Sequence, residues 1–320
     1  MPDQTIAVGA TQEGSSEKQM DQEMHVLDHR PRHGEPLWCD SPDWRKQLEE
    51  MRLSDAAKDR VEEFATQGYL IVKNAIPEQL TSEARMAYDS LMDQSKLLRE
   101  AAVRDRRLPN FHKYSEAGKR VFSRSREALK FQDLLFGYRS SVYTSLYFKH
   151  GTQQSIHRDI PVFCTQPKEF YFGVWCALED ANETNGALRA IPGGHRLHTV
   201  DPFALAARVT NDPSSIHPSD SPLWSMYQEA VHRECQAHEL KEISIEMEEG
   251  DVLIWHPMLP HGGGKILDES ATRHSMVYHV VPEGTPVYQM DVFFNRNRQD
   301  EPDLASWEYD TFEGRLFVKR

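Results

Sequence analysis

Two residues with metal-binding side chains, His157 and Asp159, stand two positions apart in the segment 155–160. If this segment is a strand, its side chains alternate between two faces, so both residues point to one side and can chelate one divalent ion. We expect a distant histidine to complete a set of two imidazoles and one carboxylate, which is typical of non-haem Fe(II) oxygenases. The candidate is His261, in the segment 259–264.

Composition and a competing motif both weaken the pair when it is taken alone. The chain has 15 histidines and 50 acidic residues, so one His-x-Asp arises easily by chance. His157-Arg158-Asp159 also matches the start of a protein-kinase catalytic loop, which needs an asparagine five residues after its aspartate. Cys164 stands at that position, and the chain has neither the glycine-rich loop nor the Asp-Phe-Gly motif of kinases. The kinase interpretation is therefore excluded.

Length and charge bound the class of protein. The 320 residues are enough for a large core in one big domain or in two smaller ones. The formal net charge of −13 argues against a nucleic-acid partner, which would need a basic surface. The same charge is compatible with a small anionic substrate that a few local arginines hold.

Membrane, export and disulfide signals are weak. No apolar run reaches about 18 residues, so we expect no membrane span and no membrane partner. The first ten residues lack the basic start and apolar stretch of a signal peptide, which favours a cytoplasmic location. The cysteines have no CxxC or zinc-finger spacing and are interpreted as free thiols. The pattern leaves a homo-oligomer open.

Short strands are the main elements that must position the candidate ligands. Alternating or apolar runs between Gly and Pro turns predict strands over residues 69–72, 141–149, 170–178, 187–191, 242–247, 252–256 and 272–281. Helical spacing predicts helices over residues 54–66, 77–94, 203–209 and 223–238. The charged block 96–107 is either a solvated helix or a loop.

Many short strands with Gly and Pro turns indicate a mainly β fold, an antiparallel sandwich or barrel of the jelly-roll type. We expect a jelly-roll core over about residues 139–285, with N-terminal helices and a helical insertion over about residues 201–240. These parts form a single domain of residues 34–320. Residues 1–33 are polar and charged, with few apolar side chains, which predicts a disordered tail.

Four motifs occur in order between residues 60 and 285. They are the strand 68–72, the His-Arg-Asp triplet, the run Asn-Gly-Ala-Leu-Arg-Ala-Ile-Pro-Gly-Gly-His at 185–195, and a run at 250–261 that begins Gly-Asp-Val-Leu-Ile-Trp-His. In this order the chain resembles the phytanoyl-CoA dioxygenase family of Fe(II)/2-oxoglutarate-dependent oxygenases. The fold of that family is a cupin-like double-stranded β-helix, which agrees with the predicted strands.

The resemblance implies Fe(II) as the metal, with 2-oxoglutarate and O₂ as co-substrates. It makes His157, Asp159 and His261 the catalytic iron ligands. Three ligands on one face of an octahedron leave the opposite face to the co-substrate and O₂. Halogenating relatives carry a small residue in place of the carboxylate, so Asp159 favours hydroxylation or another oxidation.

Four further residues are cofactor-binding candidates by the same resemblance. The guanidinium fork of Arg273 suits the distal carboxylate of 2-oxoglutarate. Strand alternation places Ser275 on the face of Arg273, where its hydroxyl can touch the same group. Gln154 is the candidate for the other carboxylate of the co-substrate, and Trp175 is expected beside the iron. Ordinary roles, such as a salt bridge for Arg273 or core packing for Trp175, remain open.

Other residues receive looser expectations. Tyr143 and Tyr147 either line the pocket or pack in the core, and Arg189 or Arg196 is expected to meet an anionic substrate. Leu188 replaces a threonine of some family members, so we expect one hydroxyl contact to the co-substrate to be missing. The remaining histidines lack ligand spacing, and none is assigned to a metal.

The favoured function is a 2-oxoglutarate-dependent iron dioxygenase that hydroxylates an unactivated C–H bond of a small molecule and releases succinate and CO₂. Desaturation and ring formation use the same oxidant and stay open. The insertion 201–240 and the N-terminal helices are the expected substrate cover. Two rival interpretations are a jelly-roll binding module without turnover and a cupin-type metal enzyme that does not use 2-oxoglutarate.

Overall fold

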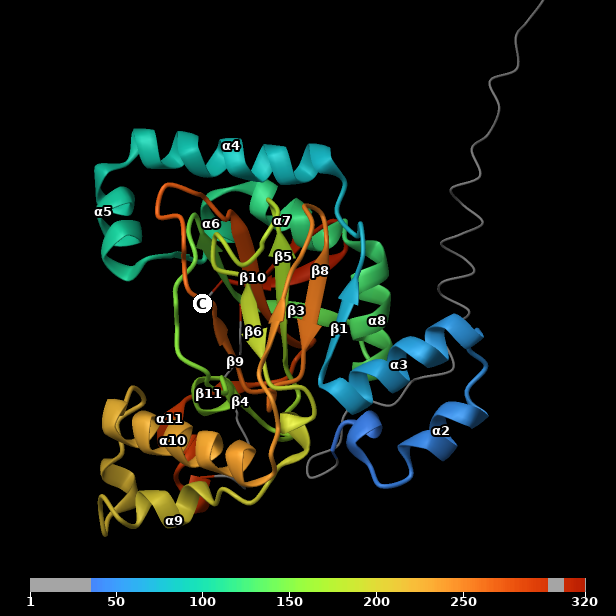
Figure 1. Ribbon diagram of the computed structural model, residues 1–320, viewed down its shortest axis with the longest axis vertical. Coiled ribbons are helices and arrows are strands. Elements are labelled where there is room, and N and C mark those ends of the chain that lie inside the picture. Colours follow the sequence, from blue (N-terminus) through green and yellow to red (C-terminus); the bar gives the residue numbers. More distant parts are fainter. Residues whose placement is uncertain (1–35, 299–307, 320) are drawn as a thin grey trace, which may run out of the picture.

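The computed structural model describes residues 36–298 and 308–319, which Figure 1 shows as a β core with helices above, beside and below it. The predicted tail 1–33 lies outside these residues. Within the described part, no helix has both the length and the apolar character that crossing a bilayer requires.

Helices make up most of the N-terminal part. The helix α3 (Asp55–Gln67) shows why they begin and end where they do: the Ser54 hydroxyl accepts a hydrogen bond from the backbone N–H of Ala57, and Gly68 ends the helix with φ of 83°. The charged block forms helix α5 (Lys96–Asp105). The other helices of this part are η1 (Trp38–Asp40), α2 (Trp44–Glu50), α4 (Glu78–Gln94), α6 (Phe111–Tyr114), α7 (Glu116–Ser123) and α8 (Arg126–Phe136).

The main sheet has eight strands in the order β1-β8-β5-β10-β3-β13-β12, with β2 paired to β3. Its strands are β1 (Tyr69–Val72), β2 (Leu108–Pro109), β3 (Ser140–Phe148), β5 (Phe172–Ala177), β8 (Val252–Trp255), β10 (Ser275–Pro282), β12 (Tyr309–Phe312) and β13 (Arg315–Val318). A three-stranded sheet β7-β6-β9 comprises β7 (Ile243–Ile245), β6 (Leu188–Ala190) and β9 (His261–Gly263). A third pair joins β4 (Cys164–Thr165) to β11 (Val287–Tyr288).

The two faces of β5 show how the layers pack. Phe172, Val174 and Cys176 join a buried cluster with helices α3, α4, α7 and α8. Trp175 and Ala177 point the other way, into a second cluster that lies between the main sheet and the three-stranded sheet. Both faces are therefore covered, and the space between the two sheets is the interior of a jelly-roll core. The predicted mainly β class with flanking helices is confirmed.

The insertion between β6 and β7 packs at one end of this core, at the bottom of Figure 1. It contains α9 (Pro202–Ala206), η4 (Pro213–Ser215) and α10 (Ser221–Ala237), and its apolar side chains form a cluster with those of η2 (Ile160–Val162) and α11 (Met290–Phe293). The short helices η3 (Gly194–Arg196) and η5 (Arg296–Arg298) complete the described elements.

Two local predictions were wrong. Residues 155–160 are not a strand: His157 makes only an isolated bridge, and Asp159 has helical angles (φ −77°, ψ −18°) because its carbonyl accepts the first hydrogen bond of the η2 turn. The strand predicted over 272–281 begins only at Ser275. Arg273 precedes it, and its backbone N–H donates to Lys149 O beyond the end of β3.

Candidate metal centre

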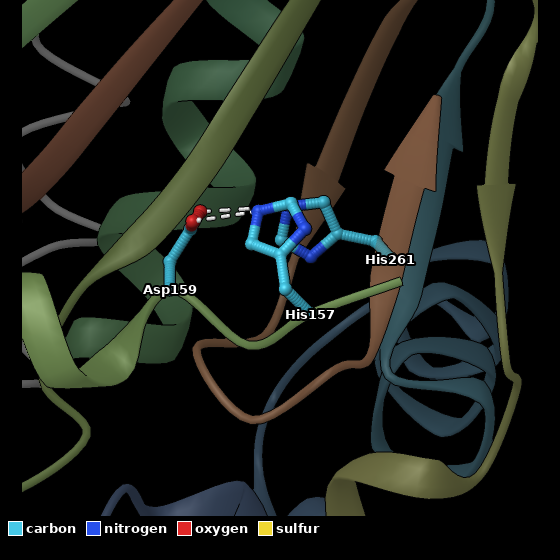
Figure 2. Close-up of side chains that lie close together, drawn as sticks. All are labelled: His157, Asp159 and His261. Atoms are coloured by element: carbon cyan, nitrogen blue, oxygen red, sulfur yellow. Dashed lines mark ion pairs between the residues drawn. The ribbon is translucent and has the colours of Figure 1, made fainter. Parts of the chain in front are cut away.

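Three potential ligands converge inside the core. The donor atoms of His157, Asp159 and His261 all lie within 4.8 Å of one another, and all three residues are buried. Nε2 of His157 is 3.2 Å from Oδ1 of Asp159, and Nε2 of His261 is 3.4 Å from Oδ2. Figure 2 shows the carboxylate facing both rings. One divalent ion between these atoms would have two imidazole ligands and one carboxylate ligand.

Backbone pairing holds the two histidines together across more than a hundred residues of sequence. The N–H of His157 donates to His261 O at 2.8 Å, and the N–H of His261 donates to His157 O at 2.9 Å. Asp159 follows in the turn that leads into η2. The predicted pairing of side chains on one face of a strand is thus replaced by a bridge and a turn, which direct both side chains to the same point.

The backbone hydrogen bonds of both rings put the lone pair on the nitrogen that faces Asp159. Nδ1 of His157 donates to Ser155 O at 2.8 Å, and Nδ1 of His261 donates to Leu259 O at 3.0 Å. This places the proton of each neutral ring on Nδ1 and the lone pair on Nε2. The amide nitrogen of Gln154 is 3.1 Å from Nε2 of His157, so this ring nitrogen already accepts from a donor.

Electrostatics favour an ionised carboxylate at this point. Burial raises the pKa of Asp159, but the neighbouring imidazoles, His261 first, outweigh it and hold the pKa well below its ordinary value. Burial lowers the pKa of His261, and the carboxylate of Asp159 reverses this and raises it. A third ring, His279, has its Nε2 3.3 Å from Oδ2 of Asp159 and lies stacked on Phe163. The carboxylate is thus available to a cation.

A second group of potential ligands, Asp40, Glu169 and His256, has the opposite hydrogen bonding. Nδ1 of His256 accepts from the backbone N–H of Met258 at 3.1 Å, so its proton is on Nε2, which donates to Asp40 at 2.9 Å. The nitrogen that faces the carboxylates therefore has no lone pair for a metal. This group is a hydrogen-bonded support between η1 and the segment after β8.

Arg273 is a buried cation among few acceptors. Its side chain is 4% exposed, its Nη1 donates to Gly186 O at 2.7 Å, and its Nε has no hydrogen-bond partner within residues 36–298 and 308–319. No carboxylate of the described residues forms an ion pair with it, and burial lowers its pKa to about 10, which still leaves it charged at neutral pH. An isolated buried charge is costly, so the site is suited to an incoming anion.

The other cofactor-binding candidates surround this guanidinium or the ligands. Trp175 lies 5.3 Å under the guanidinium of Arg273, and Oγ of Ser275 is 3.5 Å from its Nη2. Gln154, Trp175 and Arg273 line the same cavity as the three ligands, whereas Ser275 is not among the lining residues. Leu188 also lines the cavity and offers no hydroxyl.

The cavity has a volume of about 660 Å³ and is partly open to the surface. Tyr143 lines it because the β10–β3 register shifts between His279 and Val280, which leaves Tyr143 as an extra residue in the bulge. Tyr147 does not line it: its hydroxyl is 2.6 Å from Nδ1 of His274, and its ring stacks on Tyr88 of α4. Of the two tyrosines, only Tyr143 is at the site.

The arginines expected to meet a substrate lie elsewhere. Arg189 donates to Glu242 at 3.2 Å, and Arg196 donates to Ala65 O. Neither lines the cavity. Other residues line the cavity although no motif in the sequence marks them, among them Arg107, Lys113, Phe163, Trp224 and His279.

Comparison with known proteins gives partial matches at low identity. The chain is 32% identical over 172 residues to phytanoyl-CoA dioxygenase of Arabidopsis thaliana, a match that covers 52% of this chain and 53% of that one. It is 32% identical over 148 residues to phytanoyl-CoA dioxygenase 1 of rice, with 45% of each chain covered. The match to the human peroxisomal phytanoyl-CoA dioxygenase has 26% identity and covers 30% of that protein. The chain thus spans about a third to a half of the length of these relatives.

Solved structures share the fold. The carbocyclase SnoK, described as non-haem and α-ketoglutarate dependent, superposes with a TM-score of 0.52 at 15% identity, covering 80% of this chain and 93% of SnoK. The epimerase SnoN gives a TM-score of 0.54 at 14% identity, covering 83% of this chain and 98% of SnoN. The family model described as phytanoyl-CoA dioxygenase (PhyH) matches residues 64–275, about two thirds of the chain. The matched residues include His157, Asp159, His261 and Arg273. Because the match covers most of the chain, the chain belongs to the phytanoyl-CoA dioxygenase family of Fe(II)/2-oxoglutarate oxygenases.

Proposed function

We propose that this protein is an Fe(II)/2-oxoglutarate-dependent dioxygenase that hydroxylates an unactivated C–H bond of a small molecule. The observation that carries the proposal is the pairing, in one cavity, of a buried two-histidine, one-carboxylate set with the buried cation Arg273. The first suits Fe(II), and the second suits the carboxylate of a 2-oxo acid. A binding module without turnover would need neither feature.

His157, Asp159 and His261 are the proposed iron ligands. Their donor atoms fit the metal because both Nε2 atoms carry lone pairs and the carboxylate is ionised. When bound, Fe(II) and 2-oxoglutarate supply an oxidant made from O₂, with succinate and CO₂ as the other products. The backbone bridge between His157 and His261 keeps the two rings in place during the reaction.

Arg273 is the proposed anchor of the distal carboxylate of 2-oxoglutarate. A carboxylate there would restore charge balance to a buried guanidinium and give its Nε a partner. Trp175 supports the guanidinium from below, and the hydroxyl of Ser275 is near enough to donate to the same carboxylate. The side-chain amide of Gln154, beside His157, is the proposed contact of the other carboxylate.

Hydroxylation is the proposed outcome because Asp159 keeps a carboxylate at the position where halogenating relatives have a small residue. Desaturation or ring closure is the second candidate, and one solved neighbour of this fold is named as a carbocyclase. The proposed substrate is a small molecule, because the cavity holds only about 660 Å³. The cytoplasmic location remains a prediction from the sequence.

The test is succinate release from 2-oxoglutarate in the presence of Fe(II) and O₂, with candidate substrates, for the wild type, His157→Ala and Arg273→Ala. We expect both variants to lose at least about 100-fold in rate, since each removes an interaction that the reaction needs. Equal release by all three proteins would refute the proposal. Substrate oxidation that survives in Arg273→Ala and needs no 2-oxoglutarate would point to the cupin-type alternative.

A further inference from the structure

The charges on the cavity wall are uneven. Three cationic side chains line it, Arg107, Lys113 and Arg273, whereas Asp159 is the one carboxylate among its described lining residues. Asp159 and Arg273 have the proposed roles of holding iron and 2-oxoglutarate. Arg107 and Lys113 therefore stand as a second pair of positive charges with no assigned ligand.

The backbone brings these two cations to the cavity from outside the jelly-roll core. Arg107 directly precedes β2, which pairs with β3 at the cavity edge, with Leu108 opposite Tyr147. Lys113 lies in α6. The residue before this helix, Asn110, donates its backbone N–H to Ser145 O of β3 at 2.5 Å. Both positions are thus fixed to the strand that supplies the cavity wall.

Neither of these exposed cations forms an ion pair with a described carboxylate, although Asp105 interacts electrostatically with Arg107 over a longer distance. Among the residues that the structure describes, no carboxylate lies within 4 Å of the guanidinium of Arg107 or the ammonium of Lys113. The ammonium donates instead to Lys319 O at 2.7 Å, and the adjacent Asp105 is paired with Arg104 at 2.8 Å. In a chain with a net charge of −13, two unpaired cations on one wall form a local attraction for anions.

The wall near the metal ligands is aromatic. Phe163 stacks on His279 with 3.8 Å between ring centroids and meets Tyr143 edge-on at 6.1 Å. Trp224 of α10 lies 5.8 Å from the ring of His157. Apolar surface of this kind favours the hydrophobic body of a ligand over a strongly hydrated one.

We propose that the substrate is a small organic anion with an apolar or aromatic body. Its carboxylate, sulfonate or phosphate group binds Arg107 and Lys113, and its body packs on Tyr143, Phe163 and Trp224, within reach of the metal ligands. The inference rests on the proposed function, because it takes the cavity as the place of oxidation. The anionic group of the substrate is thus bound by Arg107 and Lys113, whereas Arg273 binds the carboxylate of 2-oxoglutarate.

Two fluorescent probes that differ by one anionic group test this in the metal-free full chain. They are 8-anilinonaphthalene-1-sulfonate and the neutral N-phenyl-1-naphthylamine, and fluorescence titration gives a dissociation constant for each. We expect the sulfonate to bind at least about tenfold more tightly, as charge-assisted hydrogen bonds imply. In R107Q/K113Q the ratio of the two constants should fall several-fold, leaving only the preference that Arg273 contributes in the same cavity.

Two further variants locate the effect. R208Q/K265Q removes two exposed cations that do not line the cavity and changes the net charge by the same amount, so the ratio should stay at the wild-type value. Trp224→Ala should weaken the binding of both probes equally and leave the ratio of their dissociation constants unchanged, because it removes a contact with the aromatic rings that both probes share.

The proposal is overturned by any of three results. The sulfonate does not bind saturably to the wild type, the ratio of the two dissociation constants is near one in the wild type, or R107Q/K113Q has the same ratio as the wild type. Because no iron or 2-oxoglutarate is present, these outcomes do not depend on the succinate assay. Failure of the oxygenase proposal and failure of the anion proposal are therefore distinguishable.

Discussion

The side chain of Gln228 holds both backbone polar groups of Arg158. Its Oε1 accepts from the N–H of Arg158 at 2.8 Å, and its Nε2 donates to the carbonyl at 2.9 Å. Arg158 stands between His157 and Asp159. Helix α10 of the insertion is therefore hydrogen-bonded directly to the segment that carries two of the three proposed ligands. The insertion, expected only as a substrate cover, also supports the candidate metal centre.

Replacing Gln228 by Leu should weaken metal binding, because it frees the backbone between the two ligands. We expect the dissociation constant for Co(II), a spectroscopic stand-in for Fe(II), to rise about tenfold, as for other residues that orient metal ligands. The control is Gln236→Leu on the same helix, where the side chain is exposed and contacts His232. Unchanged Co(II) affinity in Gln228→Leu would show that α10 does not support the centre.

Replacing Arg273 by Met should separate ligand binding from stability. The buried guanidinium has no counter-ion in the described structure, so its loss should leave the melting temperature of the protein without ligands equal or higher. With Co(II) already bound, added 2-oxoglutarate should raise the melting temperature of the wild type further, but not that of Arg273→Met. A large loss of stability in the variant without ligands would contradict the role of Arg273 as an unpaired anchor.

Replacing Gly173 by Ala should destabilise the core at the floor of the cavity. A Cβ at this position would lie 1.9 Å from Cε2 of Trp255, on the neighbouring strand. We expect a loss of about 1–3 kcal/mol in the free energy of unfolding, measured by urea denaturation, because a well-packed core tolerates added volume poorly. Trp255→Leu in the same chain should restore part of the loss, and independent, additive effects would exclude the steric cause.

His112 should make the fold sensitive to mild acid. Its ring is buried, with Nδ1 2.7 Å from Oγ of Ser145, and burial lowers its pKa from 6.5 to about 4. Between these values the unfolded chain binds a proton that the folded chain resists, so stability falls as the pH drops from about 6.5 to 4. The pKa difference corresponds to roughly 3 kcal/mol at most. His112→Asn should flatten this part of the urea stability curve, and an unchanged slope would exclude His112 as the cause.

The local pattern of the sequence was enough for most elements. Ser54 and Gly68 mark the two ends of α3, and the apolar runs give β1, β5 and β8, because caps and strand periodicity depend on residues that are close in sequence. The choice of His157, Asp159 and His261 also came from the sequence. It needed only residue types and the family pattern.

Tertiary structure decided the rest, since contacts between distant residues leave no local trace. The His157–His261 bridge replaces the expected strand, the bulge near His279 turns Tyr143 inward, and Arg107 reaches the cavity from a charged block whose pattern fits any solvated helix. Sequence by itself determined which side chains are the candidates for binding iron and a carboxylate. Only the folded chain determined that Arg273 is buried without a counter-ion among the described residues, because burial and pairing are set by packing between segments far apart along the chain.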